Sequence, residues 1–217
     1  MKCRTPPDTC QNSVVFFPQS VPHASEVQVE AFVDAIRPFQ TFPGVTHYAF
    51  GPLTEPTAGE WDFGLYCRFR SRAALDGYLS SEAYKEVQEK FLEPLTETSL
   101  SLCWESEIPP GVFTPDIKAV HVKLYEMKPG MEDLSKTTVV GVLPVIMTSL
   151  PKTVQVGCGK NFDSGSHQIY HWGFVMLAES LELLEQGTQS DDIIKWKEGL
   201  LAFTTQESLV ADFTCVI

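Results

Sequence analysis

Basic residues are scarce in this sequence. Its 217 residues include 16 lysines and arginines against 28 aspartates and glutamates, which gives a formal net charge of -12. A protein that binds nucleic acid or an anionic membrane surface needs the opposite charge. The composition therefore indicates a protein that handles neutral or apolar molecules, with no nucleic-acid and no membrane partner.

Long apolar runs are also missing. Hydrophobic residues make up 43% of the chain, enough for the core of one large domain or two small ones. No uncharged apolar stretch approaches the roughly 20 residues that cross a membrane. The opening MKCRTPPDTCQNS has no apolar stretch like that of a signal peptide. We therefore predict a cytoplasmic protein.

Motifs for structural metals, disulfides and dinucleotides are lacking too. The six cysteines include no CxxC pair, which favours reduced thiols over zinc ligands or disulfides. GCGKN (157–161) lacks the full glycine fingerprint of a dinucleotide-binding loop. We accordingly predict no metal ion and no organic cofactor.

The first half of the chain alternates strand and helix patterns. Short apolar runs predict strands over residues 13–18, 44–53, 60–70 and 99–108. Ser25 and Gln28 have the spacing of a capping box, which predicts a helix from there to about residue 40. A second helical pattern covers 72–95 and breaks near Ser80 and Ser81. The predicted order is β-α-β-β-α-β.

The second half repeats this order. Strand patterns cover 118–128, 152–162, 167–177 and 208–217, and helical patterns cover 131–150, with a kink at Pro144, and 179–203. Three prolines and a glycine at 109–115 predict a linker. We therefore predict an α+β fold of two tandem units, 1–108 and 116–217, each near the usual size of a small domain.

Three stretches resemble one known family. HVKLYEMKPG (121–130) resembles the first strand and turn of the stress-responsive A/B barrel family, also called Dabb or dimeric α+β barrel proteins. FPGVTHYAFG (42–51) is similar to its helix-to-strand junction, and CRFRSRAALDGYLSSEAYKEVQEKFLEPL (67–95) to its third strand and second helix. In that family, two ferredoxin-like units join sheet to sheet. The resemblance implies that both halves form such a barrel within one chain.

The resemblance also implies an activity. The family includes plant stress proteins, similar fungal proteins of secondary metabolism, and olivetolic acid cyclase, which closes a polyketide ring without a cofactor. In the cyclase, a tyrosine and a histidine of the second helix act beside the sheet, and the matching positions here are Tyr78 and Tyr84. In the second half they fall on Leu184 and near Asp191. Tyr78 is therefore a candidate catalytic residue, and Tyr84 a candidate substrate contact.

Histidines gather in the second half. HQIYHWGFV (167–175) carries His167 and His171, and His121 stands at the family's first-strand position. Even spacing in a strand points side chains to one face. We predict that these three histidines line a pocket beneath the second-half helices, with His121 and His171 as catalytic proton donors or acceptors and His167 as a substrate contact.

Further side chains complete the candidate site. Lys123 and Tyr125 share the strand parity of His121 and add a positive charge and a phenol. In the first half, Trp61 and Phe63 belong to a strand face that we expect to be buried, and they are candidates for apolar substrate contacts.

Other interpretations of the histidines stay open. His171 is as consistent with a packed structural role, and His167 with an exposed rim position. Three histidines could also hold zinc or iron, and related barrels bind heme through one histidine. We rank both below cofactor-free chemistry, because the family does not ordinarily use a metal.

The leading hypothesis is a cofactor-independent cyclase or isomerase of secondary metabolism, which closes a ring in an apolar polyketide or terpenoid intermediate. The reaction would be an aldol or Claisen closure, or a pericyclic one such as a [4+2] cycloaddition. The alternative is a non-catalytic protein that binds hydrophobic ligands or only oligomerises. A cavity of several hundred Å³ beneath the second-half helices would favour the enzyme, and one in the first half would make Tyr78 the lead residue. A homodimer is an open alternative.

Overall fold

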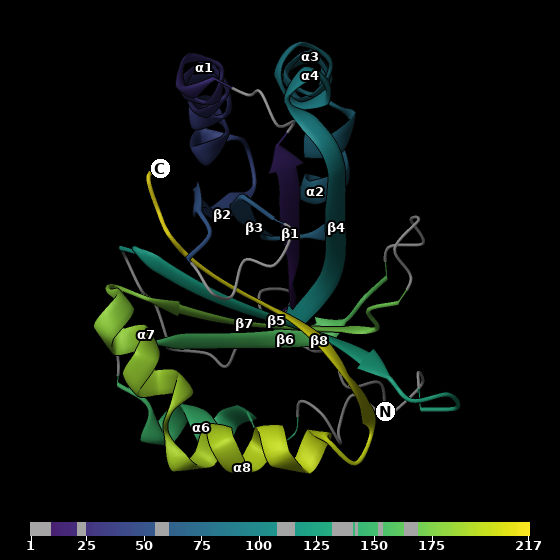
Figure 1. The fold of residues 1–217 in the computed structure, drawn as a ribbon, viewed down its shortest axis with the longest axis vertical. Helices are drawn as coiled ribbons and strands as arrows, with labels where there is room; N and C mark the ends of the chain where they lie inside the picture. Colours follow the sequence, from purple (N-terminus) through teal and green to yellow (C-terminus); the bar gives the residue numbers. More distant parts are fainter. Residues whose placement is uncertain are drawn as a thin grey trace, which may run out of the picture.

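The chain folds into two α+β units, each with a four-stranded antiparallel sheet (Figure 1). The structure is a computed structural model that describes residues 10–20, 25–54, 61–107, 116–131, 141, 143–151, 154–162 and 169–217. The strand order is β2-β3-β1-β4 in the first unit and β6-β7-β5-β8 in the second. In both orders the first strand lies between the third and the fourth, which is the predicted ferredoxin-like arrangement.

The strands fall on the apolar runs of the sequence. They are β1 (Cys10–Ser20), β2 (Val45–Pro52), β3 (Phe63–Phe69), β4 (Thr96–Glu107), β5 (Ala119–Met127), β6 (Gln155–Lys160), β7 (Trp172–Ala178) and β8 (Thr204–Thr214). The expected linker at 109–115 lies outside the described residues. Val, Ile, Phe, Tyr and Trp pack well on a pleated half-buried surface, which is why these runs form strands.

The helices of the first unit begin where polar side chains cap them. They are α1 (Glu26–Ile36), the 3₁₀ turn η1 (Arg37–Thr41), α2 (Arg72–Ser80), α3 (Glu82–Val87), the π turn η2 (Gln88–Leu92) and α4 (Glu93–Leu95). The predicted capping box is confirmed, because the Ser25 hydroxyl accepts from the Gln28 amide while Gln28 Oε1 accepts from the Ser25 amide at 3.0 Å.

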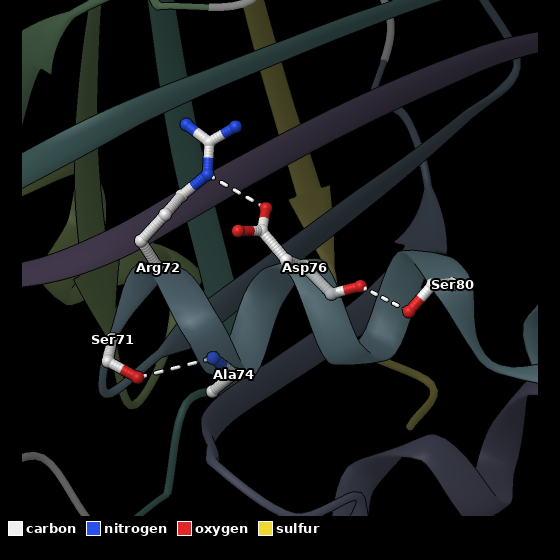
Figure 2. Close-up of polar contacts among 5 residues, drawn as sticks. All are labelled: Ser71, Arg72, Ala74, Asp76 and Ser80. Carbon is white, nitrogen blue, oxygen red and sulfur yellow. Dashed lines mark hydrogen bonds and ion pairs between the residues drawn. The ribbon is translucent and has the colours of Figure 1, made fainter.

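The predicted break after α2 has a local cause. Figure 2 shows the Ser71 hydroxyl accepting from the Ala74 amide at the start of α2, and the Ser80 hydroxyl donating to the Asp76 carbonyl near its end at 2.7 Å. The next residue, Ser81, adopts an extended backbone and caps α3 by accepting from the Tyr84 amide. The chain therefore turns between two short helices.

The second-half helices correct two expectations. They are α6 (Leu143–Ser149), α7 (Leu181–Thr188) and α8 (Asp191–Leu200). The helical pattern at 179–203 is not one helix, because Ser190 is extended and separates α7 from α8, as Ser81 does in the first unit. Pro144 does not kink a longer helix either, because Gly141 lies in a turn and α6 begins at Leu143. In the first turn the missing proline amide breaks no helical hydrogen bond.

The two sheets close into one barrel, with the helices outside (Figure 1). The edges join where the Phe162 amide donates to the Cys103 carbonyl at 2.9 Å and the Thr54 amide donates to the Asp212 carbonyl at 2.7 Å. Buried residues of both sheets, Trp104 and Phe213 among them, form one apolar cluster between the sheets. No helix in the described parts of the chain is long and apolar enough to cross a membrane.

Candidate functional site

A cavity of about 120 Å³ lies in the first unit, between the sheet and its helices. Two of its lining residues, Leu79 and Ser101, are exposed, so the cavity opens to solvent beside α2 and β4. The other lining residues are apolar or weakly polar: Val14, Phe16, Phe32, Ile36, Phe39, Tyr48, Leu65, Cys67, Tyr78, Tyr84, Val87, Gln88, Leu92 and Cys103. The cavity is smaller than expected and lies in the first half.

The tyrosines of α2 and α3 meet at this cavity. Tyr78 and Tyr84 are six residues apart and would not share a face on a straight helix. The break at Ser81 brings their ring centroids to 5.0 Å. Phe39 and Phe69 hold the Tyr78 ring at centroid distances of 5.2 and 5.1 Å. Tyr78 is therefore fixed in position by packing, as a catalytic or binding group has to be.

Tyr48 of β2 adds a second hydroxyl beside Tyr78. Burial raises the pKa of both phenols far above the ordinary value, and the Cys67 thiol beneath them adds to both shifts. The two hydroxyls are close enough to influence each other, yet the Tyr48 hydroxyl is buried and has no hydrogen bond of normal geometry within the described structure. Both phenols stay neutral and can donate a hydrogen bond to a bound molecule.

Tyr48 was not among the predicted site residues, although the alternation of its strand contained a signal for it. Tyr48 and the buried Phe50 are two residues apart on β2, so both face the helices, whereas Ala49 packs between the sheets. The parity of β2 therefore indicates that Tyr48 faces the helices. Only the tertiary structure shows that its hydroxyl lies beside that of Tyr78.

Trp61 and Phe63, the candidates for apolar substrate contacts, do not line this cavity. Trp61 packs against the apolar cluster between the two sheets. Phe63 stacks on Phe50 with ring centroids 5.5 Å apart and borders a separate groove beside α1. Trp61 precedes the first residue of β3, so the alternation of that strand does not fix its direction.

His121, Lys123 and Tyr125 share one face of β5, as their parity predicted. His121 is buried, and its Nδ1 donates to Asp212 Oδ1 at 2.6 Å on the neighbouring β8. Lys123 Nζ lies 5.2 Å from the centroid of the Tyr125 ring, which itself packs on Trp196 of α8. These side chains form a charged cluster beneath the helices of the second unit.

His171 does not join this cluster, so the expected shared face is wrong. It precedes β7, and its Nδ1 accepts a hydrogen bond from the Met127 amide at 3.1 Å. His121 lies opposite Met176, five residues beyond His171, which separates the two histidines by roughly 16 Å along the strands. The structure thus gives His171 a backbone-capping contact. His167 lies outside the described residues.

The metal alternative required histidines that meet, and His121 and His171 do not. Within the described residues, no group of three His, Cys, Asp or Glu side chains is placed to hold a metal ion. His121 is held by Asp212 through Nδ1, and its ring packs on Phe174 with 6.2 Å between the ring centroids.

The fold defines the class of protein as a dimeric α+β barrel made within a single chain. Residues 15–106, which make up most of the first unit, match the model of the stress responsive A/B barrel domain, Dabb. A search of curated proteins found no match.

Solved structures share the fold along nearly the whole chain. A proposed monooxygenase from Lactobacillus acidophilus NCFM has a TM-score of 0.65 at 12% identity and covers 94% of this chain and 92% of its own. A proposed monooxygenase from Fusobacterium nucleatum has a TM-score of 0.67 at 9% identity, with 96% and 93% covered. An anthrone oxidase-like protein has a TM-score of 0.63 at 12% identity, with 97% and 92% covered. At these identities the likeness concerns the fold alone.

Proposed function

We propose that the first unit binds a small apolar carbonyl compound and that the protein is a cofactor-independent cyclase or isomerase of secondary metabolism. The substrate would be a polyketide or terpenoid intermediate that closes a ring in the cavity. One observation carries the proposal: two neutral phenols, Tyr48 and Tyr78, lie together at an apolar cavity, and the Tyr48 hydroxyl is buried without a hydrogen bond of normal geometry among the described residues.

The protonation state of the phenols supports one type of mechanism. A tyrosine with a strongly raised pKa is a poor general base at neutral pH, but it remains a hydrogen-bond donor. Tyr48 and Tyr78 would therefore polarise a carbonyl oxygen and stabilise the negative charge that develops there. The apolar walls would hold the reacting ends together. This mechanism suits a pericyclic closure better than an aldol or Claisen closure, which requires a base.

The size of the cavity limits the substrate. An apolar cavity of about 150 Å³ holds one benzene molecule, and drug-sized ligands occupy several hundred. A cavity of about 120 Å³ therefore suits one ring-sized portion of a substrate. The rest of a longer chain would leave through the opening beside Leu79 and Ser101.

A binding experiment tests the first half of the proposal. Acetophenone supplies a ring and a carbonyl, and ethylbenzene supplies the ring alone. We expect acetophenone to bind more tightly, and Tyr48→Phe and Tyr78→Phe each to weaken it by about fivefold to tenfold, the value of one hydrogen bond. Tyr170→Phe, which alters a tyrosine outside the cavity, is the matched control. Equal binding of both compounds would contradict a carbonyl site.

A turnover experiment tests the second half. The purified protein is incubated with a synthetic linear triene ketone, which can close by cycloaddition, and with a linear tetraketide thioester, which closes by aldol chemistry. Chromatography with mass detection then separates the cyclic products. We expect faster closure of the triene, and a loss of about tenfold to hundredfold in kcat for Tyr78→Phe. Ligand binding with no acceleration of either closure would indicate the non-catalytic binding protein instead.

A further inference from the structure

The second unit carries charges where the first unit has the floor of its cavity. The hydrogen-bond registers of the two sheets are equivalent: Val14 lies between Cys67 and Cys103, and His121 lies between Met176 and Asp212. His121 therefore replaces Val14, and Asp212 replaces Cys103.

The next position on the same face follows this pattern. Phe16 lies between Leu65 and Ser101, and Lys123 lies between Phe174 and Val210. An apolar cavity floor in one unit is thus a floor with a histidine, a lysine and an aspartate in the other. Charged side chains beneath helices require partners, because burial disfavours an isolated charge.

Two lysines approach each other above this floor. Lys197 of α8 and Lys123 of β5 are both partly buried, and burial lowers the pKa of each. The charge of Lys123 lowers the pKa of Lys197 further, and the Asp212 carboxylate raises it in part. In the described part of the chain, neither ammonium group forms an ion pair. Asp212 itself is engaged by His121.

Two buried polar atoms on the same face of β5 also lack a hydrogen bond within the described structure. His121 Nε2 and the Tyr125 hydroxyl are buried without a hydrogen bond to any described residue. Both residues are only 5% exposed. His121 Nδ1 is engaged in the hydrogen bond with Asp212. Nε2 is therefore the ring nitrogen that can contact a bound molecule.

We propose that this floor is an oxyanion site in which Lys123, Lys197 and His121 bind the carboxylate of a small organic acid. The two ammonium groups supply the positive charge, and His121 Nε2 supplies a further polar contact to the bound acid. Phe174 and Trp196, with ring centroids 4.8 Å apart, provide an apolar surface for the body of the acid. The site is separate from the first-unit cavity and does not depend on the function proposed for it.

Calorimetric titration with benzoate tests this site. Benzamide has the same shape without the charge. We expect benzoate to bind at least about tenfold more tightly than benzamide, and Lys123→Met and Lys197→Met each to weaken benzoate by about tenfold or more, because each removes a charge-assisted contact. Lys195→Met removes an exposed lysine from the same helix and should change the dissociation constant by less than about twofold.

Each contrary result overturns the proposal. Absence of benzoate binding to the folded wild type, equal binding of benzamide, or insensitivity to both floor variants would exclude a carboxylate site. Inorganic phosphate that binds where benzoate does not would contradict the assigned class of acid. The variant Tyr78→Phe distinguishes the proposed acid site from the first-unit cavity: weaker benzoate binding by this variant would place the acid in the first unit. Lys123→Arg retains the charge and should retain binding, which distinguishes lost charge from lost packing.

Discussion

The two units of this chain share one backbone plan and differ in what fills the space beneath their helices. In both, a serine two residues after a strand caps the following helix, Ser71 after β3 and Ser180 after β7. Counting from these caps, Tyr78 of the first unit corresponds to Gly187 of the second, not to Leu184 as the sequence resemblance implied. Ile193 likewise corresponds to Tyr84, in place of Asp191, when the caps Ser81 and Ser190 are aligned.

The exchange at this position changes which side chain lies beneath the helices of each unit. The first unit combines the large Tyr78 with the small Cys67 below it. The second combines Gly187 with the larger Met176, whose sulfur would lie 2.8 Å from a Cβ added at Gly187. Each unit has one large and one small residue at this contact, but only the tyrosine brings a hydroxyl to the space. The comparison teaches that a ligand site can be gained or lost by compensating changes on a constant scaffold.

The largest expected effect concerns what the units share. Trp104 is fully buried between the sheets, and it packs so closely on β7 that a Cβ added at Gly173 would lie 2.7 Å from its ring. We expect Trp104→Ala to lower the free energy of unfolding by about 3–5 kcal/mol and to destabilise both units together. Urea unfolding followed by circular dichroism and fluorescence measures this. Two separate transitions would show that the barrel is not one cooperative unit; the exposed Val27→Ala should change little.

Truncations at two equivalent positions sharpen the comparison between the units. Met176→Ala should cost about 2–5 kcal/mol, because it opens a cavity in a packed core. Cys67→Ala should cost about 1 kcal/mol or less, because the residue already borders a cavity and little is removed. Chemical denaturation of both variants gives the two values. Equal losses would contradict the difference in packing between these two positions.

Alkaline pH should affect the first unit more strongly. Burial raises the pKa of Tyr48, Tyr78 and Tyr84 in the first unit and of Tyr125 in the second. A phenol with a raised pKa keeps its proton in the folded state, while the unfolded chain ionises near pH 10. Stability is therefore fully present below that pH and falls above it, by about 1.4 kcal/mol per pH unit for each such tyrosine.

Variants can locate this alkaline sensitivity. The double variant Tyr48→Phe, Tyr78→Phe should move the midpoint of alkaline unfolding to higher pH by more than Tyr125→Phe does. Circular dichroism between pH 9 and 12 measures the midpoints. A larger shift of the midpoint for Tyr125→Phe would show that the second unit is the more sensitive one.

The smallest expected effect separates stability from function. Removing a buried hydroxyl that lacks a partner should be neutral or stabilising, so Tyr48→Phe should raise the free energy of unfolding by up to about 1 kcal/mol. The same change should weaken acetophenone binding. A clear loss of stability instead would mean that the hydroxyl already has a partner in the folded protein.

Local signals predicted much of this fold. The capping box at Ser25, the break at Ser81 and the shared face of His121, Lys123 and Tyr125 depend on residues within one turn or one strand, and the structure confirms all three. The prediction that His171 and His121 line the same pocket could not rest on such local signals. It required His171 to lie inside a regular strand, whereas β7 begins at the next residue.

The sequence by itself determined the strands, the caps and the two-unit α+β plan, because period, capping and turn chemistry act between residues a few positions apart. Only the tertiary structure decided where the cavity beside Tyr78 forms, and which described polar atoms lack a hydrogen bond. Those properties depend on side chains from distant segments, such as Tyr48 with Tyr78 or Met176 with Gly187. Packing fills or leaves space according to the sum of their volumes, which no single stretch of sequence contains.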